Sequence, residues 1–231
     1  MSEETVLAQV KKVSPLTDSI VRLVLAPEHF VSYQAGQYLQ ILLGAEVLNF
    51  SIANAPLGTH EYELHIRHSR NNPYHQHLFT HIKEQGNVSL RLPFGECTLE
   101  RLDPQRPIIF IAAGTGFAPV NGMIEQLLAF DDPRPFELFW GARSQGDFYL
   151  DAKVKSWEDH VLRFKYCSLL SVESKESLAA LVLRKHARDI EDWQMVISGP
   201  FDMVYSTRDT LVNNGVSAAS LFSDAFSFES K

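Results

Sequence analysis

Short segments in which apolar and polar residues alternate fill the first hundred positions. They lie at residues 5–10, 19–25, 37–43, 50–53, 62–67 and 88–92. In the second of these, Val21, Leu23 and Leu25 alternate with the charged Arg22. Glycine and proline separate the segments at short intervals, which is typical of a small antiparallel barrel or sandwich. The pattern predicts that residues 1–103 form an antiparallel β-domain.

One segment of this half follows a different period. Leu78 and Ile82 stand four residues apart in the stretch 73–83, as they would on one face of a helix. Pro73 near its start and Gly86 just past its end favour a short helix between them.

The second half alternates strand-like and helix-like segments. We expect strands at 108–112, 136–140, 164–170, 194–198 and 219–223, and helices at about 119–130, 151–160, 178–188 and 202–213. The polar stretch 103–107 holds two prolines and is typical of a linker. Alternation of strand and helix predicts a parallel sheet covered on both faces, so residues 104–231 form an α/β domain.

Ligands of such sheets bind at the carboxyl ends of the strands. Those ends fall at residues 114–116, 141–143 and 199–201. The first is the most informative, because a strand, the turn Gly114-Thr115-Gly116 and a helix follow one another. This order points backbone N–H groups at a phosphate. Pro119 stands where a dinucleotide fingerprint has its third glycine, so a turn that binds no ligand remains an alternative.

Composition excludes several classes of function. The net charge of −7 argues against nucleic acid as the main partner. Cys97 and Cys167 are too few for a disulfide framework or a cysteine-ligated iron–sulfur cluster, and we expect both to be reduced thiols of a cytoplasmic protein. The first thirty residues show no signal peptide, and no apolar run reaches the length of a membrane span.

Three histidines cluster in the helical segment of the first half. His77 and His81 stand four apart, at a spacing that metal sites use, and His75 lies nearby. No glutamate follows His77 as in H-E-x-x-H. We therefore predict no metal site.

Four motifs in order give the chain a family resemblance. They are Asn49-Phe50-Ser51-Ile52-Ala53-Asn54, Gly114-Thr115-Gly116-Phe117, Gly199-Pro200-Phe201-Asp202-Met203 and Phe222-Ser223-Asp224-Ala225-Phe226. With them the sequence resembles the ferredoxin–NADP reductase superfamily, and most closely the stand-alone NAD(P)H–flavin reductases of the Fre/LuxG type. The resemblance covers nearly the whole chain. It implies a Greek-key flavin-binding β-barrel at 1–103 followed by an NAD(P)-binding α/β domain at 104–231.

The resemblance also implies residue roles. The Ser51 hydroxyl would lie near flavin N5 and act as the catalytic side chain. The other flavin contacts would be Asn49, Phe50, Ile52, Ala53, His65, Ile66, Arg67 and the C-terminal aromatic Phe226. The nicotinamide nucleotide would contact Gly114, Thr115, Gly116, Phe117, Arg143, Gly199, Pro200, Phe201 and Met203. For Arg143 a solvated surface position is an equal alternative, and Phe226 and Phe228 would serve equally well to close the core.

One departure from the family pattern bears on how flavin is held. Related flavin enzymes carry R-x-[YF]-[ST], with the arginine near the flavin phosphate, and Leu48 stands at that position here. A leucine cannot neutralise a phosphate, so we expect a site that holds only the ring and releases flavin as a substrate. Arg67 is a nearby cation that would weaken this inference.

The resemblance implies an NAD(P)H–flavin oxidoreductase. Hydride would pass from nicotinamide C4 to flavin N5, reducing free riboflavin, FMN or FAD with NADH or NADPH. Reduced flavin would then reach a monooxygenase, a luciferase-type enzyme or ferric iron. The alternatives are a reductase with tightly bound FAD or FMN that passes electrons to a protein partner, and a non-catalytic regulator that binds flavin or nucleotide.

Overall fold

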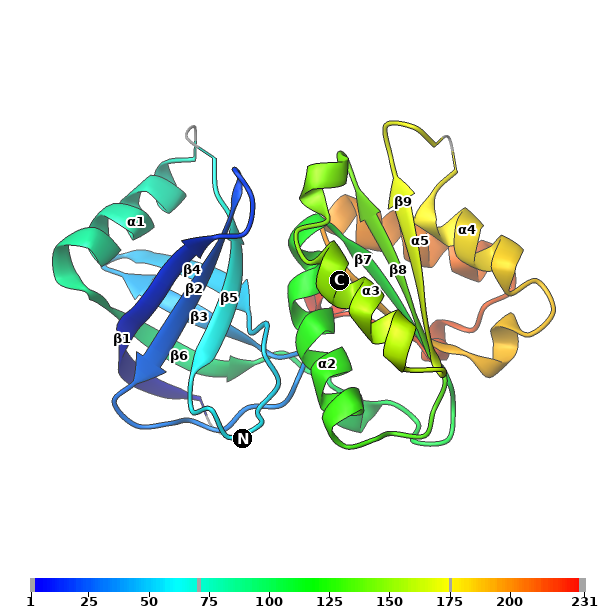
Figure 1. Ribbon diagram of the computed structural model, residues 1–231, viewed down its shortest axis with the longest axis horizontal. Coiled ribbons are helices and arrows are strands. Elements are labelled where there is room, and N and C mark those ends of the chain that lie inside the picture. The colour runs from blue at the N-terminus through cyan, green and yellow to red at the C-terminus, as the bar shows by residue number, and fades with distance from the viewer. Residues whose placement is uncertain (1–2, 70–71, 175, 229–231) are drawn as a thin grey trace. The chain divides into compact units, whose positions relative to one another are not determined.

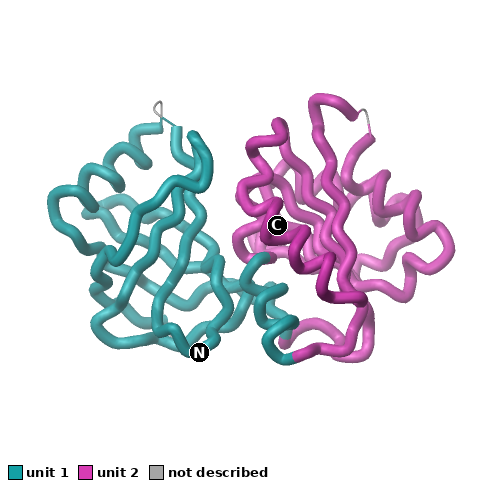
Figure 2. The backbone as a smooth tube through the Cα atoms, in the orientation of Figure 1, with its two compact units in different colours: residues 1–99, 121–130 teal, residues 100–120, 131–231 magenta. Residues whose placement is uncertain are grey.

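The computed structural model describes residues 3–69, 72–174 and 176–228. The chain folds as two compact units, drawn in two colours in Figure 2. Unit 1 holds residues 1–99 and 121–130, and unit 2 holds residues 100–120 and 131–231. The division falls twice in the chain beyond residue 99, once within helix α2 (Phe117–Ala129) and once just after it. Separate folding of two domains on either side of residue 103 stays a prediction.

Unit 1 contains a six-stranded antiparallel sheet with the order β4-β3-β6-β1-β2-β5 (Figure 1). The strands are β1 (Glu4–Pro15), β2 (Ile20–Pro27), β3 (Tyr38–Leu43), β4 (Glu46–Ser51), β5 (Tyr62–Arg67) and β6 (Asn87–Phe94). Just past β4, the Ala53 N–H donates to the Glu63 carbonyl of β5 over 2.7 Å, which joins the two edge strands. The antiparallel barrel predicted from alternation is confirmed.

Strand β4 differs from its expected position. It begins at Glu46 and ends at Ser51, whereas the sequence predicted residues 50–53. Gly44, with a φ of 61°, lies in the turn between β3 and β4, and Leu43 before the turn pairs with Glu46 after it. Strand β4 lies at the sheet edge, and Val47 and Asn49 are exposed, so residues 46–49 lack the apolar pattern of a buried strand.

Helix α1 (Pro73–Gln85) forms where the sequence placed it. The Asn72 side chain accepts hydrogen bonds from the N–H groups of Tyr74 and His75, and Gly86 ends the helix with a φ of 68°. Leu78 and Ile82 are buried in the barrel core. Their four-residue spacing therefore reports the face that packs against the strands.

Unit 2 contains a five-stranded parallel sheet with the order β11-β10-β7-β8-β9. The strands are β7 (Ile108–Ala113), β8 (Phe136–Ala142), β9 (Phe164–Leu170), β10 (Gln194–Ser198) and β11 (Leu221–Phe222), and the helices besides α2 are α3 (Asp151–His160), α4 (Leu178–Lys185) and α5 (Phe201–Asn213). Helices α4 and α5 share one core with the sheet, and Figure 1 shows α3 in front of the sheet and α5 behind it. The predicted α/β arrangement is confirmed.

Several boundaries in unit 2 differ from the sequence-based ones, among them those of α4, α2 and the last strand. Helix α4 ends at Lys185 instead of 188, because the chain leaves the helical conformation at His186. Helix α2 starts at Phe117, two residues before Pro119. The last strand covers only Leu221–Phe222, because residues 218–220 form a 3₁₀ turn before it.

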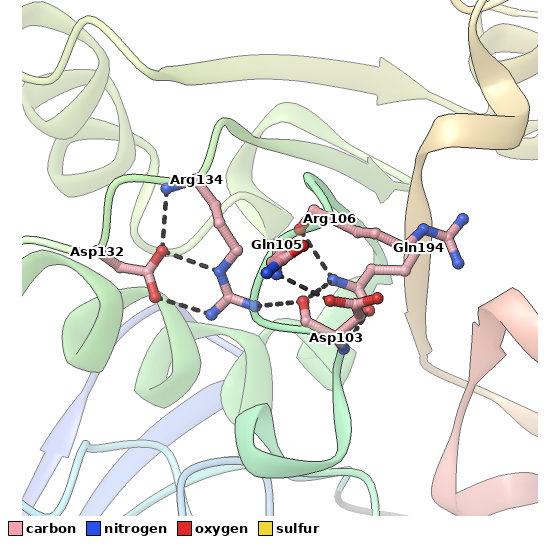
Figure 3. A network of polar contacts seen from close by, with 6 residues as sticks. All are labelled: Asp103, Gln105, Arg106, Asp132, Arg134 and Gln194. Carbon is pink, nitrogen blue, oxygen red and sulfur yellow. Dashed lines mark hydrogen bonds and ion pairs between the residues drawn. The ribbon is translucent and has the colours of Figure 1, made fainter.

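The expected linker is held firmly within unit 2, as Figure 3 shows. The Gln194 side-chain amide donates to the carbonyls of Asp103 at 2.8 Å and Arg106 at 2.9 Å. The Arg134 guanidinium donates to the Asp103 carbonyl at 3.0 Å and pairs with Asp132 at 2.8 Å. Gln194 and Arg134 are both buried, so these bonds fix the entry to β7 against the ends of β8 and β10.

No helix in the described ranges has both the length and the apolar character needed to cross a lipid bilayer.

Candidate functional site

Strand β4 and the residues after it divide their side chains between two faces. Leu48 pairs with Ile41 and Phe50 pairs with Leu39, and all four pack in or against the barrel core. Side chains alternate along a strand, so Ser51 lies on the outer face of the sheet. Asn49 shares that face. The serine hydroxyl, which is half-buried, is thus on the side available to a ligand.

The backbone after Ser51 is fixed by hydrogen bonds within unit 1. The Ile52 N–H donates to the Gln37 carbonyl at 3.0 Å, and the Asn121 side chain donates to the Ala53 carbonyl at 2.6 Å. Ile52 and Ala53 are fully buried, so their side chains face protein. Any contact of these two residues with flavin would use their backbone.

Tyr33 and Asn54 tie this segment to β5. Asn54 accepts from the Glu63 N–H at 2.8 Å through its side-chain oxygen, and the Tyr33 hydroxyl donates to the Asn54 carbonyl at 3.0 Å. Burial raises the pKa of Tyr33 far above its ordinary value, so the hydroxyl stays a donor. The sequence reasoning missed this support, because Tyr33 lies twenty-one residues before its partner.

The three predicted flavin residues of β5 have different surroundings. Ile66 packs in the barrel core. His65 is buried, with Nε2 2.9 Å from a Glu63 carboxylate oxygen that also lies 3.0 Å from Arg22 Nε. Arg67 is exposed at the strand end. Because the Ala53 N–H bonds to the Glu63 carbonyl, the structure brings the β4 and β5 segments side by side.

Gln40 and Arg91 lie on the outer face beside Asn49, and the sequence reasoning missed both. The Gln40 side chain donates to Asn49 Oδ1 at 3.0 Å and accepts from Arg91 Nε at 2.9 Å. Arg91 stands between Leu90 and Leu92, both fully buried, which already placed it on the outer face. Only the pairing of β3 with β4 and β6 put it in line with Asn49.

The α1 histidines do not converge on a metal site. His77 Nδ1 lies 2.8 Å from a Glu46 carboxylate oxygen. Within the described part of the chain, no three His, Cys, Asp or Glu side chains gather closely enough to hold a metal ion.

In unit 2 the two glycine loops meet at the carboxyl edge of the sheet. Strands β7 and β10 are neighbours, with Ala112 paired to Ser198, although two strands separate them in the chain. A Cβ on Gly116 would lie 2.2 Å from the Ser198 carbonyl oxygen, so only glycine permits this approach. A Cβ on Gly199 would likewise lie 3.1 Å from the Cβ of Ala113. This is the point where the strand order reverses, which is where open α/β sheets bind ligands.

Buried aromatic side chains support the first glycine loop, residues 114–116. The Trp140 indole N–H donates to the Gly114 carbonyl at 3.1 Å, and its ring stacks on Phe117 at 4.1 Å. Both rings are fully buried, and Phe148 and Tyr149 pack edge-on against Trp140. The Phe117 side chain therefore supports the loop, and contact with a nucleotide would use its backbone.

Two predicted nucleotide contacts are exposed at this edge. Arg143 follows β8 directly and makes no hydrogen bond or ion pair with the residues that the structure describes. Its guanidinium is thus available to a phosphate. Phe201 begins α5 with 53% of its surface exposed, whereas Met203 is partly buried against the sheet core. Thr115 and its flanking glycines are half-buried.

The C-terminal segment packs onto α5. The Tyr205 hydroxyl donates to the Ala225 carbonyl at 2.8 Å, and Arg208 lies over the Phe226 ring at 5.5 Å. Phe228 contacts Phe201 with ring centres 5.8 Å apart. Phe226 belongs to unit 2, whereas the other flavin candidates belong to unit 1, so its flavin contact stays a proposal.

The residues fit the two groups that this arrangement suggests. An outward serine beside backbone that is fixed on both sides can hydrogen-bond a polar ring edge. Half-buried glycine backbone at the switch point, with an unpaired Arg143 one strand away, can hold a dinucleotide phosphate.

Comparison with known proteins agrees with this assignment. Residues 110–209 match the oxidoreductase NAD-binding domain family. The chain is 31% identical over 213 residues to the CDP-6-deoxy-L-threo-D-glycero-4-hexulose-3-dehydrase reductase of Yersinia pestis, covering 90% of this chain but only 64% of that protein. It is 25% identical to the NAD(P)H-flavin reductase of Vibrio harveyi, covering 97% of this chain and 99% of that one. The crystal structure of an Amycolatopsis cytochrome P450 reductase superposes with a TM-score of 0.82 at 20% identity, covering 96% of this chain and 69% of that one.

The α/β fold of unit 2 and its glycine loops thus agree with the match of residues 110–209 to an oxidoreductase NAD-binding domain. More particularly, the chain is similar over nearly its whole length to the NAD(P)H-flavin reductases of Vibrio harveyi and Aliivibrio fischeri, at 25% and 27% identity.

Proposed function

We propose that this protein reduces free flavin with NADH or NADPH. The observation that carries the proposal is the placement of Leu48. Its side chain packs against the barrel core, at the position where the family pattern has an arginine for the flavin phosphate. A site without that charge holds a flavin mainly by its ring, which suits a substrate that binds and leaves. Near-complete coverage of the Vibrio flavin reductase supports the same conclusion.

Ser51 is the proposed catalytic side chain. When bound, flavin supplies a ring that accepts two electrons and a proton. The Ser51 hydroxyl can donate a hydrogen bond before reduction and accept one afterwards, since a hydroxyl does both. The anchored backbone at Ile52 and Ala53 keeps this hydroxyl in place, so the contribution of the chain is mainly positioning.

The nucleotide side is proposed for the edge of unit 2. The backbone of Gly114, Thr115 and Gly116 would receive the nucleotide, with the Gly199 loop beside it. Arg143 would pair with a phosphate, because its guanidinium is exposed and unpaired among the described residues. Phe201 would cover the nucleotide from the start of α5.

The experiment follows NADH oxidation at 340 nm by thoroughly desalted protein, with and without added FMN or riboflavin. Turnover that needs added flavin and saturates with it supports flavin as a substrate. Protein that keeps its yellow colour after desalting, and reduces an artificial acceptor with no flavin added, contradicts the proposal. Substituting NADPH identifies the preferred nucleotide.

A second function is favoured by one observation. The Yersinia relative is named as the reductase of a dehydrase, and this chain spans 64% of its length. Electron delivery to a protein partner from bound flavin is therefore the alternative. The desalting experiment separates the two, and absence of turnover under every condition would favour a regulator. A cytoplasmic location belongs to the same proposal.

A further inference from the structure

A pocket of about 360 Å³ opens at one end of the barrel in unit 1, and none of the residues assigned above to flavin or nucleotide is among its lining residues. It is lined by Val13, Val21, His68, Ser69, His75, Gln76 and Phe79. Its walls come from the β1–β2 hairpin, the end of β5 and the first turns of α1. The volume falls in the range that holds small organic ligands.

The pocket lies on the inner side of the sheet. Val13 pairs directly with Leu23, and Val21 stands two residues before it, so both share the face on which Leu23 enters the barrel core. Ser51 instead lies on the outer face. The pocket is therefore a continuation of the barrel interior, where small barrels commonly bind ligands.

His75 gives this apolar pocket a polar anchor. Its Nδ1 is buried and has no hydrogen-bond partner among the described residues. Burial and the neighbouring His68 lower the pKa of His75, so its ring is neutral at neutral pH. A neutral imidazole has one N–H donor and one acceptor nitrogen, and a buried nitrogen of either kind without a partner is costly.

The lining residues favour an aromatic and uncharged ligand. Aromatic surface comes from Phe79 and His68, whose rings meet edge to face at 5.9 Å. Val13 and Val21 supply the aliphatic wall, and Val13 is 46% exposed, so the mouth is open to solvent. The seven lining residues in the described part of the chain include no Lys, Arg, Asp or Glu, so these seven supply no charge to balance a charged ligand.

We propose that this pocket binds a small uncharged phenol, with its ring against Phe79 and the two valines and its hydroxyl donating a hydrogen bond to His75 Nδ1. The lining contains none of the residues assigned to flavin or nucleotide, and the proposal does not depend on the proposed function.

The test uses 2-naphthol as the probe and the full chain without added flavin. Isothermal titration should show saturable one-to-one binding. 2-Methoxynaphthalene has the same rings but no hydroxyl donor, and it should bind about tenfold more weakly, as expected for the loss of one buried hydrogen bond. Riboflavin should not compete with 2-naphthol.

Three variants complete the test. His75→Phe keeps a ring but removes the acceptor, and it should weaken 2-naphthol about tenfold while leaving 2-methoxynaphthalene unchanged. Val13→Trp fills the exposed mouth and should abolish binding of both. His77→Phe on the same helix, outside the pocket lining, is the matched control and should bind like the wild type. Circular dichroism confirms that each variant is folded.

Absence of saturable 2-naphthol binding overturns the proposal. Equal affinity of the two probes, or an unchanged affinity in His75→Phe, removes the assigned hydrogen bond and overturns it as well. Competition by riboflavin would place the phenol in the flavin site, with the same consequence.

Discussion

The contact between the two glycine loops of unit 2 makes Gly116→Ala a sharp perturbation. The added Cβ would lie 2.2 Å from the Ser198 carbonyl oxygen and 2.7 Å from Gly199 Cα. Ordinary contact begins at 3.4 Å, so the loops must part by about 1.2 Å. Both obstacles are backbone, which no side-chain rotation relieves. We expect a loss of roughly 1–3 kcal/mol in the free energy of unfolding, as for overpacked interiors.

The larger effect should fall on the nucleotide. A displacement of 1 Å in a positioning element can cost about 100-fold in rate, so kcat/KM for NADH should fall by about that factor. The KM for flavin should change little, because the flavin candidates on β4 and β5 belong to unit 1. NADH oxidation at 340 nm with either substrate varied separates the two effects.

Gly146→Ala is the matched control for this variant. Gly146 follows β8 in the same unit, and the nearest atom to its added Cβ is Ser144 Oγ at 4.0 Å. It should keep wild-type stability and kinetics. The reasoning fails if Gly116→Ala binds NADH as well as the wild type does, or if both variants lose the same activity.

Three further outcomes follow from the structure. Ser51→Ala should lower kcat about 10- to 100-fold with an unchanged KM for NADH in steady-state assays, because it removes the proposed hydrogen bond to the reacting ring. Arg143→Ala should raise the KM for NADH about tenfold and leave kcat unchanged, provided that the guanidinium binds a phosphate. Burial alone would lower the pKa of His186, but hydrogen bonds and charges from Glu137 and Asp189 outweigh burial and raise the pKa above 6.5. The contribution of His186 to the free energy of unfolding is therefore complete below about pH 6.5 and is lost as the pH rises through the raised pKa. Thermal unfolding should show a larger gap between wild type and His186→Gln at pH 5.5 than at pH 8.5, and an equal gap would contradict this assignment.

The sequence was most informative where local pattern and burial coincide. The alternation of Val21, Leu23 and Leu25 marked a barrel strand, and the four-residue spacing of Leu78 and Ile82 marked the buried face of α1. It was least informative at edges and ends. The first half of β4 carries no apolar pattern, and α4 ended three residues early at a buried His186 that bonds to β8.

The candidate sites show the same division. Motifs alone suggested Ser51 and the two glycine loops as site residues, because a hydroxyl or a glycine is recognisable at a single position of the chain. The supports of those motifs were invisible. Asn121 holds the Ala53 carbonyl and Trp140 holds the Gly114 carbonyl from positions far along the chain.

By itself, the sequence determined the class of each half, because a period of two or the alternation of strand and helix depends only on neighbouring residues. The tertiary structure decided strand order, and with it the meeting of β7 and β10 at the switch point. It also turned Leu48 toward the core and left His75 facing a pocket. These features depend on which distant segments pair, and pairing is settled by the burial of the whole core and not by any local pattern.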